Sequence, residues 1–230
     1  MNTAEIQAHD PVKLAVFDFD GTCLDGSSTV RLVGDLLFSR KLGIGTGLKI
    51  GIWGLKYKLH LPQDESWVRA KVWKPFIGHP APDVDLWLRD YYDRVVERIW
   101  RSGASEAIAK HQKQGLTVMI VSASFEPIVM QACSRHGIEH QVSTRMHVRE
   151  DGTYGSQVEG LPIEGEQKLV ALRAFADGKF GPGNWVIEYA YGDHYSDRTL
   201  LEQANHPCAV SPDTTLARHA KEQGWSILTW

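Results

Sequence analysis

The sequence has few cysteines and no long apolar run. Its three cysteines are scattered without a pairing pattern. An odd, unpaired number argues against a disulfide framework and favours a reducing compartment, so we expect a cytoplasmic protein. The segment before the first apolar run is polar and mixed in charge, without the apolar core of a secretion signal. Charged residues interrupt every apolar stretch well before the roughly 20 residues that a membrane-spanning helix needs.

The sequence also lacks a strong excess of either charge. It has 25 Lys and Arg against 28 Asp and Glu, for a formal net charge of −3, and 43% of its residues are hydrophobic. This balance excludes a disordered chain and gives no sign of a nucleic-acid partner. A length of 230 residues fits one large domain, or a domain with a sizeable insertion. The oligomeric state cannot be read from the sequence.

Short apolar runs alternate with segments of helical periodicity. The predicted strands are Val12 to Asp18, Leu116 to Ser122, "NWVIEYAYGD" and "HPCAV", and helical patterns separate them. This alternation predicts an α/β fold, with a Rossmann-like parallel sheet covered by helices on both faces. Ser124 is the expected N-cap of the helix that follows the second run, and Gly137 its end, so His136 and His140 would not share that helix. An Asp-Gly turn in "MHVREDGTYGSQVEG" predicts a β-hairpin.

One region interrupts the alternation. Between Thr22 and Gly103 the apolar residues fall at helical spacing, which predicts a helical insertion after the first strand. We therefore expect a core domain of residues 1–22 and 103–230 and an inserted domain of residues 23–102. Five of the eight tryptophans lie in this insertion, and we expect them to pack between its helices: Trp53, Trp67, Trp73, Trp87 and Trp100.

The candidate functional residues follow the predicted strands. Ligands of parallel α/β sheets bind beyond the carboxyl ends of the strands, so the loops after Asp18, Ser122 and Asp193 should converge on one crevice. Residues two apart on an extended backbone share a face, which would turn both Asp18 and Asp20 toward that crevice.

Four segments, taken in order, resemble the motifs of the haloacid-dehalogenase-like (HAD) superfamily. They are "DFDGT" from Asp18, "MIVS" ending at Ser122, Lys168, and "GDHYSD" ending at Asp197. The insertion, and the hairpin before "QKLVAL", resemble the phosphoserine-phosphatase-like branch, subfamily IB, in which the insertion is a helical cap. The resemblance implies a Mg²⁺-dependent phosphatase that hydrolyses a small phosphomonoester through an aspartyl-phosphate intermediate. The partner expected is therefore a small phosphorylated metabolite.

The same resemblance implies a role for each motif residue. Asp18 would be the nucleophile, and Asp20 would protonate the leaving alkoxide and later take a proton from water. The phosphate would be held by Gly21, Thr22, Ser122, the N–H of Ala123 at a helix N-terminus, and Lys168. Mg²⁺ would be bound by Asp18, Asp193 and the backbone carbonyl of Asp20, with Asp197 orienting metal-bound water.

Two other functions use similar residues. Phosphotransfer to an acceptor other than water, as in a mutase, needs the same set. A phospho-accepting signalling domain also combines an Asp, Mg²⁺, a Ser or Thr and a Lys, but the large insertion and the second acid, Asp20, argue against it.

Three further features concern the substrate and the cap, and none of them identifies the substrate. Phosphoserine phosphatases recognise the substrate amine with an acid just after the first motif, where this sequence has Ser27. His194 lies beside Asp193, and we expect a solvent-facing loop residue there, with contact to the leaving group as the alternative. The basic stretch Arg40 to Lys58 is expected to belong to the cap, because its glycines would weaken a membrane-surface helix.

Overall fold

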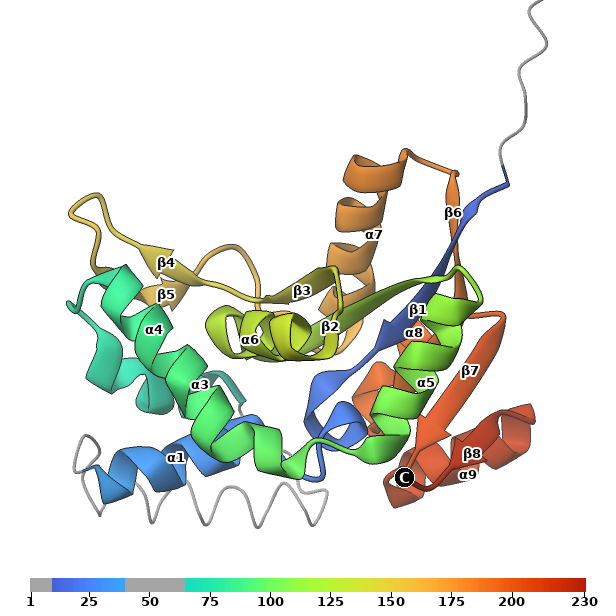
Figure 1. The fold of residues 1–230 in the computed structure, drawn as a ribbon, viewed down its shortest axis with the longest axis horizontal. Helices are drawn as coiled ribbons and strands as arrows, with labels where there is room; N and C mark the ends of the chain where they lie inside the picture. The colour runs from blue at the N-terminus through green and yellow to red at the C-terminus, as the bar shows by residue number, and fades with distance from the viewer. Residues whose placement is uncertain (1–9, 40–64) are drawn as a thin grey trace, which may run out of the picture.

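The fold is built on a six-stranded sheet. A computed structural model describes residues 10–39 and 65–230, and its sheet has the order β3-β2-β1-β6-β7-β8, with every neighbouring pair parallel (Figure 1). The strands are β1 (Val12–Phe17), β2 (Thr117–Phe125), β3 (His140–Thr144), β6 (Trp185–Gly192), β7 (His206–Val210) and β8 (Ser226–Leu228). The predicted α/β class is confirmed.

The central strand β1 is apolar because helices cover both of its faces. Leu14 and Val16 pack into one hydrophobic cluster, whereas Ala15 and Phe17 pack into the other. The first cluster is closed by α7 (Glu166–Phe180), α8 (Arg198–Leu201) and α9 (Thr214–Gln223). The second is closed by α5 (Ser102–Lys113), α6 (Glu126–His136) and the insertion. A strand buried on both sides reads as a continuous apolar run, as this one does.

Helix α6 ends before Gly137, as predicted from the sequence. Gly137 takes the left-handed conformation, with φ +63°, and its N–H donates to the carbonyl of Cys133. This geometry is typical of a glycine that ends a helix. His136 thus lies on α6 and His140 on β3, and the two do not form a helical metal site.

The insertion after β1 is helical, as expected. It contains α1 (Ser28–Phe38), α3 (Glu65–Trp73) with a 3₁₀ turn (Lys74–Phe76), and α4 (Ala81–Tyr91), which continues through two irregular turns (Tyr92–Val96 and Glu97–Ile99). The two connections to the core run side by side, because Leu24 and Trp100 form an isolated antiparallel bridge. The basic stretch Arg40 to Lys58, which includes Trp53, lies outside the described residues.

Among residues 10–39 and 65–230, no helix is long and apolar enough to cross a membrane.

The predicted hairpin is also present, formed by β4 (Met146–Val148) and β5 (Tyr154–Val158). It packs on the insertion: Pro80 bridges Thr153, and the indole N–H of Trp73 donates to the carbonyl of Gly155 at 3.1 Å. Figure 1 shows the hairpin beside α4, away from the sheet. The hairpin therefore contacts the insertion although it follows β3 in the chain. The domain boundaries given above stay a prediction.

Trp73 is the centre of the aromatic cluster between insertion, hairpin and core. It is 1% exposed and contacts the rings of Phe76, Phe125 and Tyr154. We predict that Trp73→Ala lowers the free energy of unfolding by about 3–5 kcal/mol, since it removes a large buried ring and leaves a cavity. Urea denaturation measures this change.

The control for this prediction is Leu86→Ala on α4. Leu86 is 71% exposed, so its truncation should change the free energy of unfolding by about 0.5 kcal/mol or less. Equal losses in the two variants would contradict the placement of Trp73.

Candidate active site

Asp18 leaves β1 at the carboxyl edge of the sheet. Its backbone N–H donates to the carbonyl of Tyr191 on β6 at 2.9 Å, and its side chain is buried. A wide turn (Phe19–Cys23) follows, in which Gly21 has φ +82°. A Cβ at Gly21 would come within 2.0 Å of the Asp193 carboxylate. Glycine is therefore required here both for the backbone conformation and for the close approach to Asp193.

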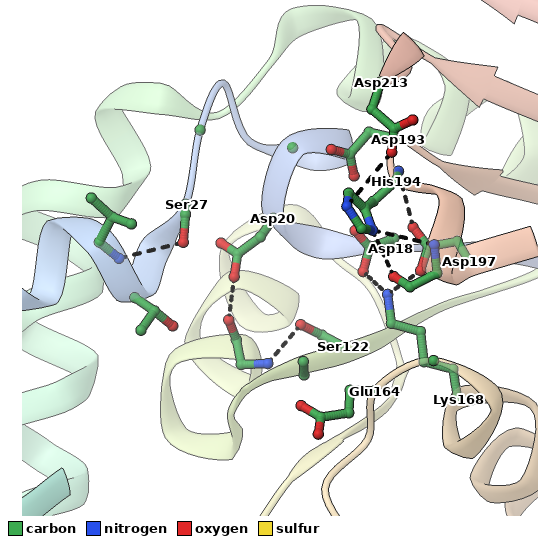
Figure 2. A pocket seen from close by; sticks show the side chains of 18 of the residues that line it. Asp18, Asp20, Ser27, Ser122, Glu164, Lys168, Asp193, His194, Asp197 and Asp213 are labelled. Carbon is green, nitrogen blue, oxygen red and sulfur yellow. Dashed lines mark hydrogen bonds and ion pairs between the residues drawn. The ribbon is translucent and has the colours of Figure 1, made fainter. Parts of the chain in front are cut away.

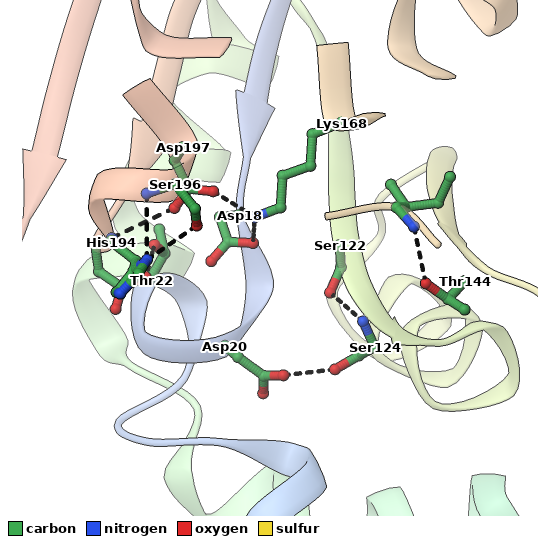
Figure 3. Close-up of polar contacts among 12 residues, drawn as sticks. Asp18, Asp20, Thr22, Ser122, Ser124, Thr144, Lys168, His194, Ser196 and Asp197 are labelled. Carbon is green, nitrogen blue, oxygen red and sulfur yellow. Dashed lines mark hydrogen bonds and ion pairs between the residues drawn. The ribbon is translucent and has the colours of Figure 1, made fainter. Parts of the chain in front are cut away.

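Lys168 connects two acids across the floor of the site. It lies in the first turn of α7, and its Nζ is 2.5 Å from Asp18 Oδ1 and 2.5 Å from Asp197 Oδ1 (Figure 3). Burial opposes the charge of Lys168, but the two carboxylates outweigh it and raise the pKa of Lys168 above its usual range. Lys168 is thus a permanently charged group between Asp18 and Asp197.

Three carboxylates gather at this point. Oxygens of Asp18, Asp193 and Asp197 all lie within 4.8 Å of one another. Burial, followed by the charges of the other two acids, raises the pKa of Asp193 well above its usual range. Burial also raises the pKa of Asp18 to about 7, although Lys168 opposes the rise. One lysine does not balance three carboxylates, and an all-oxygen donor set with surplus negative charge fits a hard divalent cation such as Mg²⁺.

Thr22 supports this cluster. Its Oγ1 donates to Asp193 Oδ1 at 3.2 Å, and the residue is fully buried. Of the residues predicted for the site, Thr22 is the one that does not line the pocket.

Strand β2 brings two serines to the site, and its end differs from expectation. The strand continues to Phe125, with a register shift after Ser122, and α6 begins only at Glu126. The prediction of Ser124 as N-cap was wrong, because Phe125 occupies that position and makes no side-chain cap. Ser122 and Ala123 accordingly lie in the strand, before the helix N-terminus. Ser122 Oγ accepts the N–H of Ser124 at 3.0 Å, so its own proton can be donated elsewhere.

Asp20 points away from the acidic cluster (Figures 2 and 3). One carboxylate oxygen accepts the N–H of Ser28 at 2.6 Å, and the other accepts the Ser124 hydroxyl at 2.5 Å. Burial raises the pKa of Asp20, and these hydrogen bonds oppose the rise. No local pattern pointed to Ser28 as a site residue, because it only begins a segment of helical periodicity.

The pocket encloses about 770 Å³ and lies between the sheet edge and the insertion (Figure 2). The insertion contributes Thr29, Val30 and Val33 from α1 and Arg69 from α3. Arg69 forms an ion pair with Glu164, which precedes α7, and so joins the insertion to the core.

His194 lines the same pocket, and its side chain is 29% exposed. Its Nδ1 is 2.9 Å from Ser196 Oγ, and its Nε2 is 3.6 Å from the Asp213 carboxylate. The side chain is therefore oriented by two neighbours at the mouth of the site.

Several known proteins resemble this chain in sequence. The sequence profile of the haloacid dehalogenase-like hydrolases matches residues 15–202. A probable phosphatase of Mycobacterium tuberculosis is 30% identical over 220 residues, which cover 94% of this chain and 75% of that protein. A histidinol-phosphatase of Neisseria meningitidis is 30% identical over 124 residues, which cover 54% of this chain and 56% of that protein.

Solved structures share the fold. A protein of unknown function from Bordetella pertussis matches with a TM-score of 0.83 at 21% identity, over 95% of this chain and 98% of that one. A phosphoserine phosphatase, solved as an analogue of its phospho-aspartyl intermediate, matches with a TM-score of 0.64 at 20% identity, over 96% and 94% of the two chains.

The contact between Gly21 and Asp193 gives a test of the acidic cluster. We predict that Gly21→Ala displaces the Asp193 carboxylate and weakens Mg²⁺ binding by roughly 10- to 100-fold, the usual effect of disturbing a group that orients a metal ligand. Titration calorimetry measures the affinity.

Gly115→Ala is the matched control. Gly115 has nearly the same φ, +78°, but no atom within 4 Å of an added Cβ. Both variants should lose about 1–2 kcal/mol of stability from backbone strain, whereas only Gly21→Ala should lose affinity for Mg²⁺. Equal affinities would show that Asp193 is not part of a metal site.

Proposed function

Because this chain belongs to the haloacid dehalogenase-like hydrolase family, we propose that it is a Mg²⁺-dependent phosphatase that hydrolyses a small phosphomonoester through an aspartyl-phosphate intermediate. The observation that carries this proposal is the separation of the two acids after β1. Asp18 is paired with Lys168, and Asp20 is bound by hydroxyl and amide donors, yet both line one pocket. Two acids in different surroundings suit two different roles.

The charges around Asp18 suit attack on a phosphate. The buried Lys168 offsets part of the negative charge that accumulates when a dianionic phosphate meets a carboxylate. Ser122, Ala123 and Gly21 line the same pocket. The Ser122 hydroxyl, the N–H of Ala123 and the backbone at Gly21 would bind phosphate oxygens.

The acidic cluster would hold Mg²⁺. Asp18, Asp193 and the backbone carbonyl of Asp20 are the proposed ligands. Asp197 is engaged by Lys168 and by the N–H of His194, which supports an orienting role for it. Bound Mg²⁺ would withdraw charge from the phosphate oxygens and so make the phosphorus more electrophilic.

The chain's own residues then carry two displacement steps. In the first, a carboxylate oxygen of Asp18 forms a bond to phosphorus, the ester P–O bond breaks, and the proton of Asp20 passes to the leaving alkoxide. In the second, a water oxygen bonds to phosphorus, the bond to Asp18 breaks, and the water proton passes to Asp20. Inorganic phosphate leaves, and both acids return to their starting states.

The pocket supports a small phosphorylated metabolite as substrate. Its volume of about 770 Å³ is that of a small-molecule site. Relatives of this chain include a histidinol-phosphatase and, by fold, a phosphoserine phosphatase, both enzymes of small phosphomonoesters by name. Ser27 stands where phosphoserine phosphatases carry an acid, and its hydroxyl accepts the N–H of Val30 as the N-cap of α1. Ser27 therefore favours a leaving group other than serine.

Phosphate release from p-nitrophenyl phosphate and a panel of phosphorylated metabolites tests the proposed reaction. We expect many turnovers per enzyme, all dependent on added Mg²⁺. Release of one equivalent of p-nitrophenol per chain, with the phosphoryl group retained on the protein, would indicate a phospho-accepting signalling domain. Transfer to a second alcohol without release of phosphate would indicate a phosphotransferase or mutase.

Replacing Asp18 and replacing Asp20 should reduce the activity to different extents. We predict that Asp18→Asn reduces turnover to background, because no nucleophile remains. Asp20→Asn should lower the hydrolysis of an alkyl phosphate by roughly 10²–10⁴-fold, the usual contribution of general acid–base catalysis. A phenolate leaves without an acid, so the phosphorylation step with p-nitrophenyl phosphate should lose much less.

Asp151→Asn is the control for both variants, since Asp151 lies in the exposed hairpin turn, outside the pocket. It should keep full activity. An Asp18→Asn enzyme that still turns over, or an Asp20→Asn enzyme whose phosphorylation step slows equally with both esters, would contradict the assignment of roles.

A further inference from the structure

We propose that Ser28 and Ser124 are positioning residues that hold the Asp20 carboxylate for its proton transfers. The inference rests on the proposed function, because it assigns partners to the acid–base group of that reaction. It makes the first turn of the cap helix α1 part of the catalytic apparatus of the core.

Asp20 is bound through both of its oxygens, from both domains. From α1, the Ser28 N–H donates to Oδ1 at 2.6 Å and the Ser28 hydroxyl donates to Oδ2 at 3.1 Å. From β2, the Ser124 hydroxyl donates to Oδ2 at 2.5 Å. Ser28 and Ser124 are 0% and 2% exposed, so water does not compete for these hydrogen bonds.

Neither hydroxyl is needed to cap a helix. The N-cap of α1 is Ser27, whose Oγ accepts the N–H of Val30, and Ser28 is already inside the helix. The N-cap of α6 is Phe125, and Ser124 lies in the stretch of β2 where the register with β3 shifts. Serine commonly serves as a helix cap, but here both hydroxyls are directed to Asp20 instead. The geometry of the two hydroxyls therefore indicates that their role is to bind the Asp20 carboxylate.

The position of Ser28 is itself fixed from the cap. The Tyr91 hydroxyl on α4 donates to the Ser28 carbonyl at 2.7 Å, and Tyr91 is fully buried. Burial raises the pKa of Tyr91, which keeps the hydroxyl a donor. A chain of contacts thus runs from α4 through α1 to Asp20.

The two hydroxyls also contact each other. Asp20 Oδ2, Ser28 Oγ and Ser124 Oγ form a triangle with sides of 2.5, 2.8 and 3.1 Å. Because each of the three oxygens contacts the other two, the triangle restrains the position of Asp20 Oδ2 more than one hydroxyl would.

A double-mutant cycle between Ser124 and Asp20 tests the proposal. The probes are glycerol 2-phosphate and p-nitrophenyl phosphate, followed in single turnovers with labelled substrate. We expect Ser124→Ala to slow phosphorylation by glycerol 2-phosphate roughly ten- to a hundred-fold, as the loss of a hydrogen bond to a charged group would. Its KM should stay unchanged, and the aryl ester should be affected less. In the Asp20→Asn background, Ser124→Ala should cause no further loss.

Ser28→Ala gives an independent second variant. It keeps the N–H donor to Asp20 Oδ1 but loses the hydroxyl, so the slowing of phosphorylation by glycerol 2-phosphate should be smaller than in Ser124→Ala.

Ser143→Ala is the matched control. Ser143 is a buried serine on the neighbouring strand β3, its hydroxyl donates to Gln141, and it lies outside the pocket lining. It should leave both rates unchanged.

Two results would overturn the inference. One is an equal loss from Ser124→Ala in the wild-type and Asp20→Asn backgrounds, which would mean that Ser124 acts without Asp20. The other is wild-type behaviour of both serine variants on glycerol 2-phosphate. Failure of the proposed function looks different, because the wild-type enzyme would then release no phosphate from either ester.

Discussion

The ion pairs of Lys168 determine how the site is assembled. Its single positive charge lies between the buried carboxylates of Asp18 and Asp197. Asp18 directly follows β1, Asp197 lies in the 3₁₀ turn after β6, and Lys168 lies in the first turn of α7. A buried charge is tolerated only when it is paired. The segments that carry Asp18, Lys168 and Asp197 must therefore come together when the chain folds. Asp193 adds a third carboxylate that Lys168 does not neutralise. The negative charge that remains is the physical reason for proposing Mg²⁺ at this edge of the sheet.

The turn between Asp18 and Asp20 separates the surroundings of two acids that are neighbours in sequence. Asp18 faces the lysine and the acidic cluster, whereas Asp20 faces hydrogen-bond donors of the cap helix α1 and of β2. These different environments suit the roles proposed for the two carboxylates, Asp18 as nucleophile and Asp20 as proton carrier. Because α1 supplies part of the surroundings of Asp20, the proposed mechanism gives the insertion a part in the chemistry. Arg69 and Glu164 also line the pocket, and their ion pair is a second contact that joins the insertion to the core.

Local sequence signals predicted most of the fold and part of the site. The apolar run of β1, the helix end at Gly137 and the hairpin turn each depend on neighbouring residues, and each was predicted correctly. Asp18, Asp193 and Lys168 could be found because motif residues at strand ends and helix starts must converge in a parallel sheet. Ser124 was misread as a helix cap, since its partner, Asp20, lies 104 positions away and the shift in β2 has no local signature. The packing of the hairpin on the insertion was equally invisible, because it depends on Trp73 and Gly155 meeting in space.

The central claim is that Asp18, held beside Lys168, becomes covalently phosphorylated during turnover. Its most direct test is acid quenching of the enzyme during hydrolysis of a ³²P-labelled phosphomonoester, followed by proteolysis and mapping of the labelled peptide. We expect label on the peptide that contains Asp18, and hydroxylamine should release it, as it does an acyl phosphate. Label on any other residue, or steady turnover with no labelled peptide at any quench time, would contradict it.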